Sequence, residues 1–140
     1  MCMSPNVFRT SLRVAWVDTD AAQVVHYSNY FRFFERAEEE FYRHLGFSFD
    51  DAVKHGVWLP RVEVFCRYHK PAKFNDLLEV ELTIEELREK SVKYGFRISD
   101  KETATLLADG YVVVVAADKQ TGKSTLIPKE IAEKLRLFSE

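Results

Sequence analysis

The sequence predicts an α+β fold with an antiparallel sheet, and the order of its hydrophobic patterns is the reason. A strand-like segment at 8–16 comes first, and a long helical pattern and a short one follow at 28–45 and 49–55. Four alternating segments complete the order, at 61–69, 77–87, 91–99 and 105–118. Strands gathered after the helices are typical of antiparallel sheets. No repeat or linker divides the 140 residues, so we expect one domain spanning 1–140.

The first strand and the helices have recognisable ends. The alternation in 8–16 is broken by the sequence Asp18-Thr19-Asp20, because aspartate favours turns. Ser28 or Asn29 can cap the long helix, and Gly46 can end it. One face of this helix is apolar, with residues that recur at spacings of three and four: Tyr30, Phe34, Ala37, Phe41 and Leu45. A short helix follows at 49–55, and a final helix is expected at 129–138.

Three of the later strands are apolar on one face only, so a single layer must cover that face. The long helix is the expected cover. The segment 112–115 is four valines, and it is therefore apolar on both faces. Its outer face is predicted to pack against another subunit, and the alternative is a central strand that is covered locally.

Composition excludes several classes of protein. A formal net charge of −2 argues against a dedicated nucleic-acid binder. The longest apolar run, 111–117, is too short to span a bilayer, and the start of the chain has no signal-peptide core. Cys2 and Cys66 give no zinc spacing and no disulfide framework, so no metal is expected. These features predict a cytoplasmic protein without a membrane partner.

Residues 16–30 place carboxylates beside the start of a helix. Helix N-termini carry unpaired N–H groups and partial positive charge. A carbonyl oxygen bound there would be stabilised as negative charge develops, and a carboxylate a few residues upstream could act as a base or as a nucleophile. These parts suit acyl transfer or hydrolysis. The alternative is that Asp18 and Asp20 only form and cap the turn.

The stretch "DTDAAQVVHYSNYFRFFERAEEE" resembles the active-site segment of the hotdog-fold acyl-CoA thioesterases. The nearest branch is the 4-hydroxybenzoyl-CoA thioesterase-like one, which includes the bacterial thioesterases linked to the Tol-Pal cluster. The segments 68–84 and 122–131 extend the resemblance along nearly the whole chain. It implies a hotdog fold, in which a five-stranded antiparallel sheet wraps around one long central helix. It also implies that an acyl-CoA thioester is the substrate and that no cofactor is needed.

The resemblance assigns roles to single residues. Asp20 matches the catalytic carboxylate, and Tyr27 falls where the backbone N–H meets the thioester oxygen. Asn29 and Tyr30 match the pair that begins the helix, and Asp18 is expected to be structural. The chain departs from the family pattern at Ala22-Gln23 and at His26-Tyr27, where related proteins often read Tyr-His. His26 therefore has either an active-site role or a packing and hydrogen-bonding role.

The resemblance also implies that coenzyme A binds at a subunit interface in a homodimer, and the two-sided valine run suggests a homotetramer. Trp58 and Leu59 are candidates for the acyl pocket, or for the core. Candidate ligands for the coenzyme A phosphates, which could equally be solvated surface groups, are Arg61, Lys70, Lys73, Lys90, Ser91 and Lys93. Two other functions stay open: a hotdog hydratase or dehydratase, and a non-catalytic protein that binds acyl thioesters.

Overall fold

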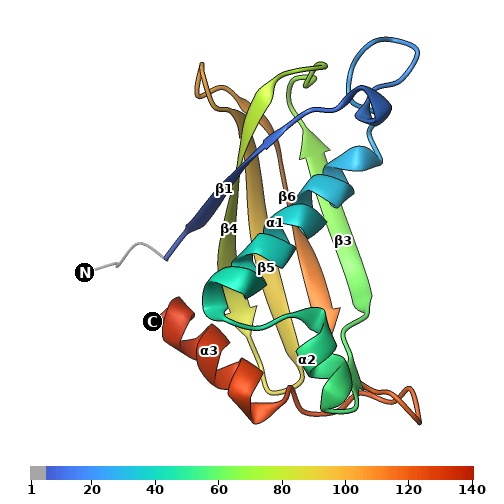
Figure 1. Ribbon diagram of the computed structural model, residues 1–140, viewed down its shortest axis with the longest axis vertical. Helices are drawn as coiled ribbons and strands as arrows, with labels where there is room; N and C mark the ends of the chain where they lie inside the picture. The colour runs from blue at the N-terminus through green and yellow to red at the C-terminus, as the bar shows by residue number, and fades with distance from the viewer. Residues whose placement is uncertain (1–5) are drawn as a thin grey trace.

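The computed structural model describes residues 6–140, so Cys2 lies outside the described residues. Five antiparallel strands form the main sheet in the order β1-β4-β5-β6-β3 (Figure 1). They are β1 (Phe8–Arg13), β3 (Arg61–Tyr68), β4 (Leu77–Leu87), β5 (Ser91–Asp100) and β6 (Leu106–Val115). A small second sheet pairs β2 (Val57–Trp58) with β7 (Ala117–Asp118). The predicted α+β class with an antiparallel sheet is confirmed.

Three α-helices accompany the sheet: α1 (Asn29–Leu45), α2 (Phe49–Lys54) and α3 (Lys129–Ser139). Gly46 ends α1 in the left-handed conformation, at φ +90°, and its N–H bonds the carbonyl of Tyr42, as its place after the apolar stripe predicts. The first strand is shorter than predicted. It ends at Arg13, residues 14 and 15 have no regular structure, and a 3₁₀ turn (Trp16–Asp18) begins at the last predicted residue. The predicted last strand, 105–118, is divided into β6 and β7.

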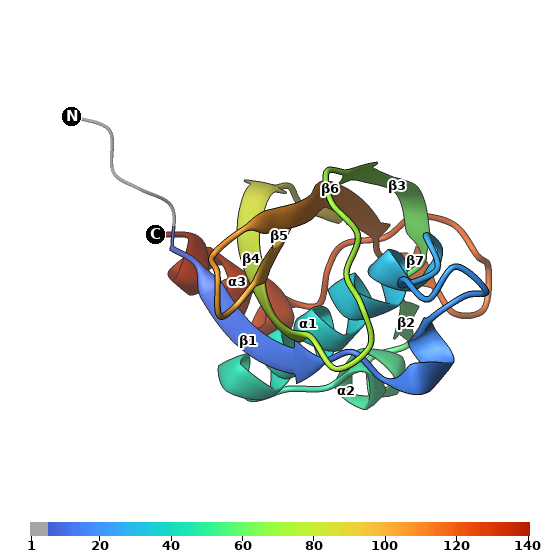
Figure 2. The same cartoon turned by 90° about the horizontal axis from the view of Figure 1, so that it is seen from above.

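The core lies between α1 and the inner face of the sheet. Seen from above, the sheet curves from β1 round to β3, and α1 lies on its inner side (Figure 2). The rings of Phe34 and Phe96 stack at 4.5 Å between centroids, and Phe41 contacts Tyr94 edge to face. Three inward-facing residues of β4, Leu78, Val80 and Leu82, are fully buried, and Ile84 is partly buried. The alternation in β4 and β5 therefore predicted the buried face correctly.

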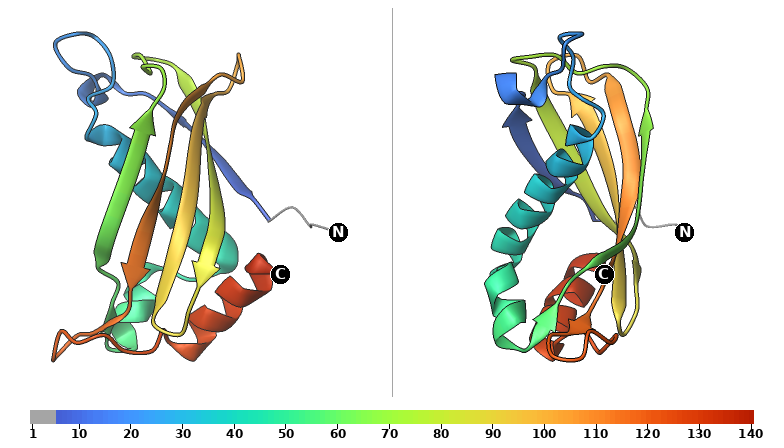
Figure 3. Two further views of the ribbon diagram at one scale, coloured as in Figure 1. Left: turned by 180° about the vertical axis from the view of Figure 1, so that it is seen from behind. Right: turned by 90° about the vertical axis from the view of Figure 1, so that its right-hand side faces the viewer.

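The outer face of the sheet has no helix over it. In the part of the chain that the structure describes, α1 and α3 lie on the opposite side (Figure 3). Val112 and Val114 are buried beneath the sheet, whereas Val113 and Val115 are half-buried on the outer face. The predicted packing of this outer face against another subunit stays a prediction.

Strand β3 forms one edge of the sheet, and it is unusually apolar for an edge. Its exposed side chains include Val62, Val64, Phe65 and Tyr68, with exposed fractions of 40–61%. The register between β3 and β6 shifts between Arg61 and Glu63, so a bulge separates Arg61 from the rest of the strand. Arg61 pairs with Val114, whose side chain is buried under the sheet, and it therefore faces the same inner side.

Candidate active site

Asp18 holds the loop that precedes α1. It is 8% exposed, and its carboxylate accepts the N–H of Ala15 at 2.8 Å. Its carbonyl oxygen accepts two further hydrogen bonds, from the N–H of His26 at 2.9 Å and from Nδ2 of Asn29 at 2.8 Å. These contacts give Asp18 the structural role that was expected of it. They also fix the loop against the first residue of α1.

Asp20 lies in the tight turn that follows. Its backbone N–H bonds the carbonyl of Val24, and its carboxylate oxygen Oδ1 accepts the N–H of Ala22 at 2.8 Å. Within residues 6–140, no group donates to the other carboxylate oxygen, Oδ2. Gln23 has φ +67°, a left-handed conformation that favours glycine. This conformation explains why a family pattern with glycine near this position would suit the turn.

The backbone N–H of Tyr27 is free in the described part of the chain. The carbonyl of His26 accepts the N–H of Asn29 at 2.9 Å, at the start of α1. Because C=O and N–H point in opposite directions in a trans peptide, the N–H of Tyr27 points away from α1. The carbonyl of Tyr27 accepts the hydroxyl of Tyr68, at 2.9 Å. The peptide groups on both sides of Tyr27 are therefore held, and one amide donor is left uncommitted.

His26 makes local hydrogen bonds. Its Nδ1 lies 2.8 Å from Oγ of Ser28 and accepts the N–H of Ser28 at 3.2 Å. An amide N–H can only donate, so Nδ1 carries no proton in this arrangement. The imidazole also stacks on the ring of Tyr27, at 4.5 Å between centroids. The geometry favours the hydrogen-bonding alternative for His26, and this bond occupies the amide of Ser28.

Asn29 and Tyr30 tie the loop to the rest of the fold. Nδ2 of Asn29 donates to Asp18, and the buried hydroxyl of Tyr30 accepts the N–H of Ala72 at 3.2 Å. Burial raises the pKa of Tyr30 above its ordinary value, against the opposing effect of the Ala72 N–H. Substrate contact by either residue stays a prediction.

The remaining candidate ligands lie at opposite ends of the long axis of the molecule. Lys70 and Lys73 lie in the loop after β3, which reaches the active-site loop because Val24 pairs with Lys73 and the N–H of Val25 bonds the carbonyl of Ala72. Five candidates lie at the opposite end, around the start of β3, the β4–β5 hairpin and the start of β5 (Figure 1): Trp58, Arg61, Lys90, Ser91 and Lys93. A single chain therefore does not bring the predicted ligands together.

Trp58 lies at the rim of a shallow apolar hollow. The side chain is 51% exposed, and the hollow has a volume of about 300 Å³ between α2 and the segment that leads into β3. Its other lining residues are Phe49, Ala52, Val53, Val57, Leu59 and Pro60. The structure thus places Trp58 and Leu59 together at an open surface, as an apolar pocket requires, but far along β3 from Tyr27.

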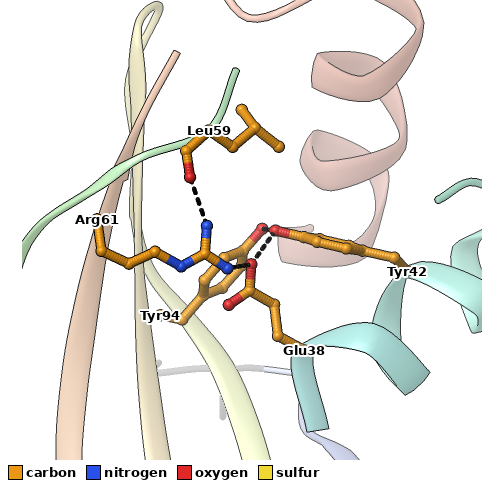
Figure 4. A network of polar contacts seen from close by, with 5 residues as sticks. All are labelled: Glu38, Tyr42, Leu59, Arg61 and Tyr94. Atoms are coloured by element: carbon orange, nitrogen blue, oxygen red, sulfur yellow. Dashed lines mark hydrogen bonds and ion pairs between the residues drawn. The ribbon is translucent and has the colours of Figure 1, made fainter. Parts of the chain in front are cut away.

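A buried polar network was not found from the sequence. Its members are Glu38 and Tyr42 on α1, Tyr94 on β5 and Arg61 (Figure 4). Burial raises the pKa of Glu38 above its ordinary value, and the nearby Arg61 charge opposes this rise. Burial also raises the pKa of Tyr42 and of Tyr94. Glu38 follows Ala37 on the apolar face of the helix, so a carboxylate inside that face was the available signal.

A model of one protein family matches residues 14–135, and its description is the Thioesterase-like superfamily. The chain belongs to this superfamily. The family resemblance of the loop and helix sequence is thereby confirmed. The match includes Asp20, Tyr27 and every strand of the main sheet except β1, which ends at Arg13, before the match begins.

Relatives of this superfamily member cover nearly its full length. A putative esterase of Aquifex aeolicus is 34% identical over 132 residues, which is 94% of this chain and 98% of that protein. The acyl-CoA thioester hydrolase YbgC of Escherichia coli O157:H7 is 34% identical over 134 residues, 96% of this chain and 99% of that protein.

Solved structures share the fold. A 1,4-dihydroxy-2-naphthoyl-CoA thioesterase from Synechocystis superposes with a TM-score of 0.88 at 25% identity, over 93% of this chain and 96% of the other. A hypothetical protein from Aquifex aeolicus superposes with a TM-score of 0.85 at 33% identity, over 91% and 98%. The sheet and helices are those of the hotdog thioesterases.

Two further features concern possible ligands and membranes. Among residues 6–140, no group of three or more His, Cys, Asp or Glu side chains could hold a metal ion. Over the same residues, no helix has the length and apolar character needed to cross a bilayer.

Proposed function

We propose that this chain hydrolyses acyl-CoA thioesters at the loop before α1. The observation that carries the proposal is the pairing of a free donor with a free acceptor. The N–H of Tyr27 has no partner in the described chain, and Asp20, whose Oδ2 is uncommitted, lies in the adjoining turn. The bridge between Thr19 and Val25 holds these two parts of the loop side by side. Names of relatives that include acyl-CoA thioester hydrolase support the same reaction.

The proposed chemistry uses only groups of the chain and water. The thioester oxygen accepts the N–H of Tyr27, which stabilises the negative charge that develops on it. In one route, Asp20 removes a proton from a water molecule while the water oxygen bonds to the carbonyl carbon. In the direct route, a carboxylate oxygen of Asp20 attacks that carbon itself. The C–S bond then breaks, and the coenzyme A thiolate takes up a proton. In the direct route, water afterwards hydrolyses the acyl-enzyme.

The arrangement of the chain suggests where the substrate lies. Lys70 and Lys73 are the candidate cations nearest the loop, and we assign them to the coenzyme A phosphates.

We also propose that α1 is the central helix around which the hotdog sheet wraps. No cofactor and a cytoplasmic location remain predictions from the sequence.

We propose further that β3 pairs with β3 of a second copy. An exposed edge with apolar side chains is a template for another strand, and natural proteins usually protect such edges. Two-fold symmetry would make the two strands antiparallel and continue the sheet across the dimer. The exposed apolar side chains of β3, Val62 and Val64 among them, would then be covered.

Replacing Val64 with Glu is expected to give a monomer. Val64 is 47% exposed in the isolated chain, so the substitution leaves the fold of one chain intact. In the dimer, it would place two carboxylates close to the two-fold axis. Sedimentation equilibrium should then give the mass of one chain. Leu137→Glu is the matched control, because it adds the same charge at an exposed apolar position of α3, away from β3 and from the outer face of the sheet. A Val64→Glu protein with the same assembly mass as the wild type would show that β3 is not an interface.

A thiol-release assay over a panel of acyl-CoAs tests the proposed reaction. Steady release of coenzyme A by the wild-type protein is the expected result. Turnover of enoyl-CoA without thiol would identify a hydratase instead. Thermal stabilisation by acyl-CoA with no turnover would identify a binding protein. Either of these two results would overturn the proposal.

A further inference from the structure

The polar network around Arg61 has a definite geometry. Nη2 of Arg61 donates to Oε2 of Glu38 at 2.5 Å, and Nη1 donates to the carbonyl of Leu59 at the same distance (Figure 4). The hydroxyl of Tyr42 donates to the same Glu38 oxygen at 2.6 Å, and the hydroxyls of Tyr42 and Tyr94 lie 2.9 Å apart. The guanidinium is therefore fixed from α1 and from the segment before β3.

The two charged partners differ in exposure. The side chain of Glu38 is 2% exposed, whereas that of Arg61 is 26% exposed. A guanidinium has five N–H donors, and only the two bonds just described engage them within the described residues. The guanidinium carbon also lies 5.2 Å from the centre of the Phe49 ring, at the edge of the hollow that contains Trp58. Donors that are fixed and partly exposed are suited to bind a ligand.

Stability alone is a weak explanation for this network. Removing two charges from water is costly, and replacing a buried ion pair with apolar residues is often neutral or stabilising. A fold that only needed a filled core would not require the arginine. The rigid fork of a guanidinium matches oxygen acceptors such as carboxylates.

In one chain, Arg61 is remote from the catalytic loop. Tyr68 bonds the carbonyl of Tyr27 at one end of β3, and Arg61 is at the other end, about 23 Å away at a rise of 3.3 Å per residue. Both side chains face the inner side of the sheet. Antiparallel pairing of β3 with a second β3 would reverse one strand, so Arg61 of the partner subunit would lie near Tyr68 and the loop.

We propose that Arg61 determines acyl specificity at the active site of the partner subunit. It binds an oxygen on the acyl group, hydroxyl or carboxylate, remote from the thioester. Glu38 and the carbonyl of Leu59 hold the guanidinium in place. The proposal rests on the proposed function and on the proposed β3 dimer.

Matched substrates test the specificity. The pairs are hydroxybenzoyl-CoA with benzoyl-CoA, and an ω-carboxyacyl-CoA with the unsubstituted acyl-CoA of equal length. Wild type is expected to have the higher kcat/KM for the oxygen-bearing member of at least one pair, and which pair it prefers identifies hydroxyl or carboxylate. A charge-assisted hydrogen bond predicts that Arg61→Met lowers this ratio by about 10-fold or more.

Because Arg61→Met leaves Glu38 unpaired, the double variant Glu38→Gln/Arg61→Met is tested in parallel. Arg136→Met, at an exposed position of α3, is the matched control and should keep the wild-type ratio. Hydrolysis by wild type of both members of each pair at equal efficiency would overturn the role of Arg61 while the proposed function stands. No hydrolysis of any thioester would instead overturn the proposed function.

Mixed dimers test whether Arg61 acts across the interface. One subunit carries Asp20→Asn and the other carries Glu38→Gln/Arg61→Met, and the heterodimer is purified by two different tags. If Arg61 serves the partner's site, one site combines an intact Asp20 with an intact Arg61. The heterodimer should then have the wild-type substrate ratio and about half the wild-type rate per dimer. A heterodimer with the ratio of the Arg61 variant would show that Arg61 serves its own subunit, and would overturn the proposal.

Discussion

Replacement of Asp20 by Asn is expected to lower kcat for acyl-CoA hydrolysis by about 10²–10⁴-fold, the range for a positioned proton-transfer group. The amide oxygen can still accept the N–H of Ala22, so the turn should keep its conformation. It can neither take a proton from water nor attack the carbonyl carbon. KM should change little, because the Tyr27 N–H and the lysines near the loop are untouched. Steady-state thiol release measures both constants.

Asp50→Asn is the matched control for this substitution. Asp50 is exposed in the first turn of α2, and removing its charge should leave kcat unchanged. Thermal unfolding of each variant reports whether the fold is retained. If Asp20→Asn keeps full activity, Asp20 has no chemical role, and the turn-forming alternative is correct for it as it is for Asp18.

The parts of the fold that sequence patterns predicted are those with local causes. The apolar stripe of α1 and the alternation of β4 and β5 depend on neighbouring residues, and Gly46 ends the helix as expected. The strand order has no local cause. Strand β3 pairs with β6, which lies 38 residues further along the chain at the nearest ends of the two strands, from Tyr68 to Leu106. That order places an apolar strand at the edge of the sheet.

The candidate site, like the fold, could be predicted only where neighbouring residues determine it. Residues 18–30 are contiguous, so their types alone indicated a carboxylate beside a helix start. The bonds that give Asp18 its structural role and leave the Tyr27 amide free depend on backbone directions, which composition does not specify. Arg61 was predicted as a phosphate ligand from its charge. Its pairing with Glu38 could not be predicted, because the two residues lie on separate elements 23 positions apart.

Removing the Arg61 charge is expected to cost the largest amount of stability. Arg61→Met leaves the carboxylate of Glu38 buried without a cation, and breaking a buried pair in this way costs about 3–5 kcal/mol. The double variant Glu38→Gln/Arg61→Met should lose much less, since no charge is left buried. Tyr42 can still donate to the amide oxygen. Urea denaturation at equal protein concentration gives the free energy of unfolding of each protein.

The Arg61→Met protein should regain stability as the pH falls, and the titration of Glu38 determines the direction of this change. Burial raises its pKa above the ordinary value of 4.5 while Arg61 opposes the rise, so losing Arg61 raises the pKa of Glu38 further. A carboxyl with a higher pKa in the folded state binds more protons when folded. The contribution of this carboxyl group to the stability of the fold is therefore greatest below its pKa in the unfolded state. It is lost as the pH rises through its pKa in the folded state. The deficit of Arg61→Met relative to wild type should shrink as pH falls from neutrality toward 4.5. The double variant should show no such recovery, because glutamine does not titrate. If the stability deficit of Arg61→Met keeps a constant size across this pH range, Glu38 is not the group left unpaired.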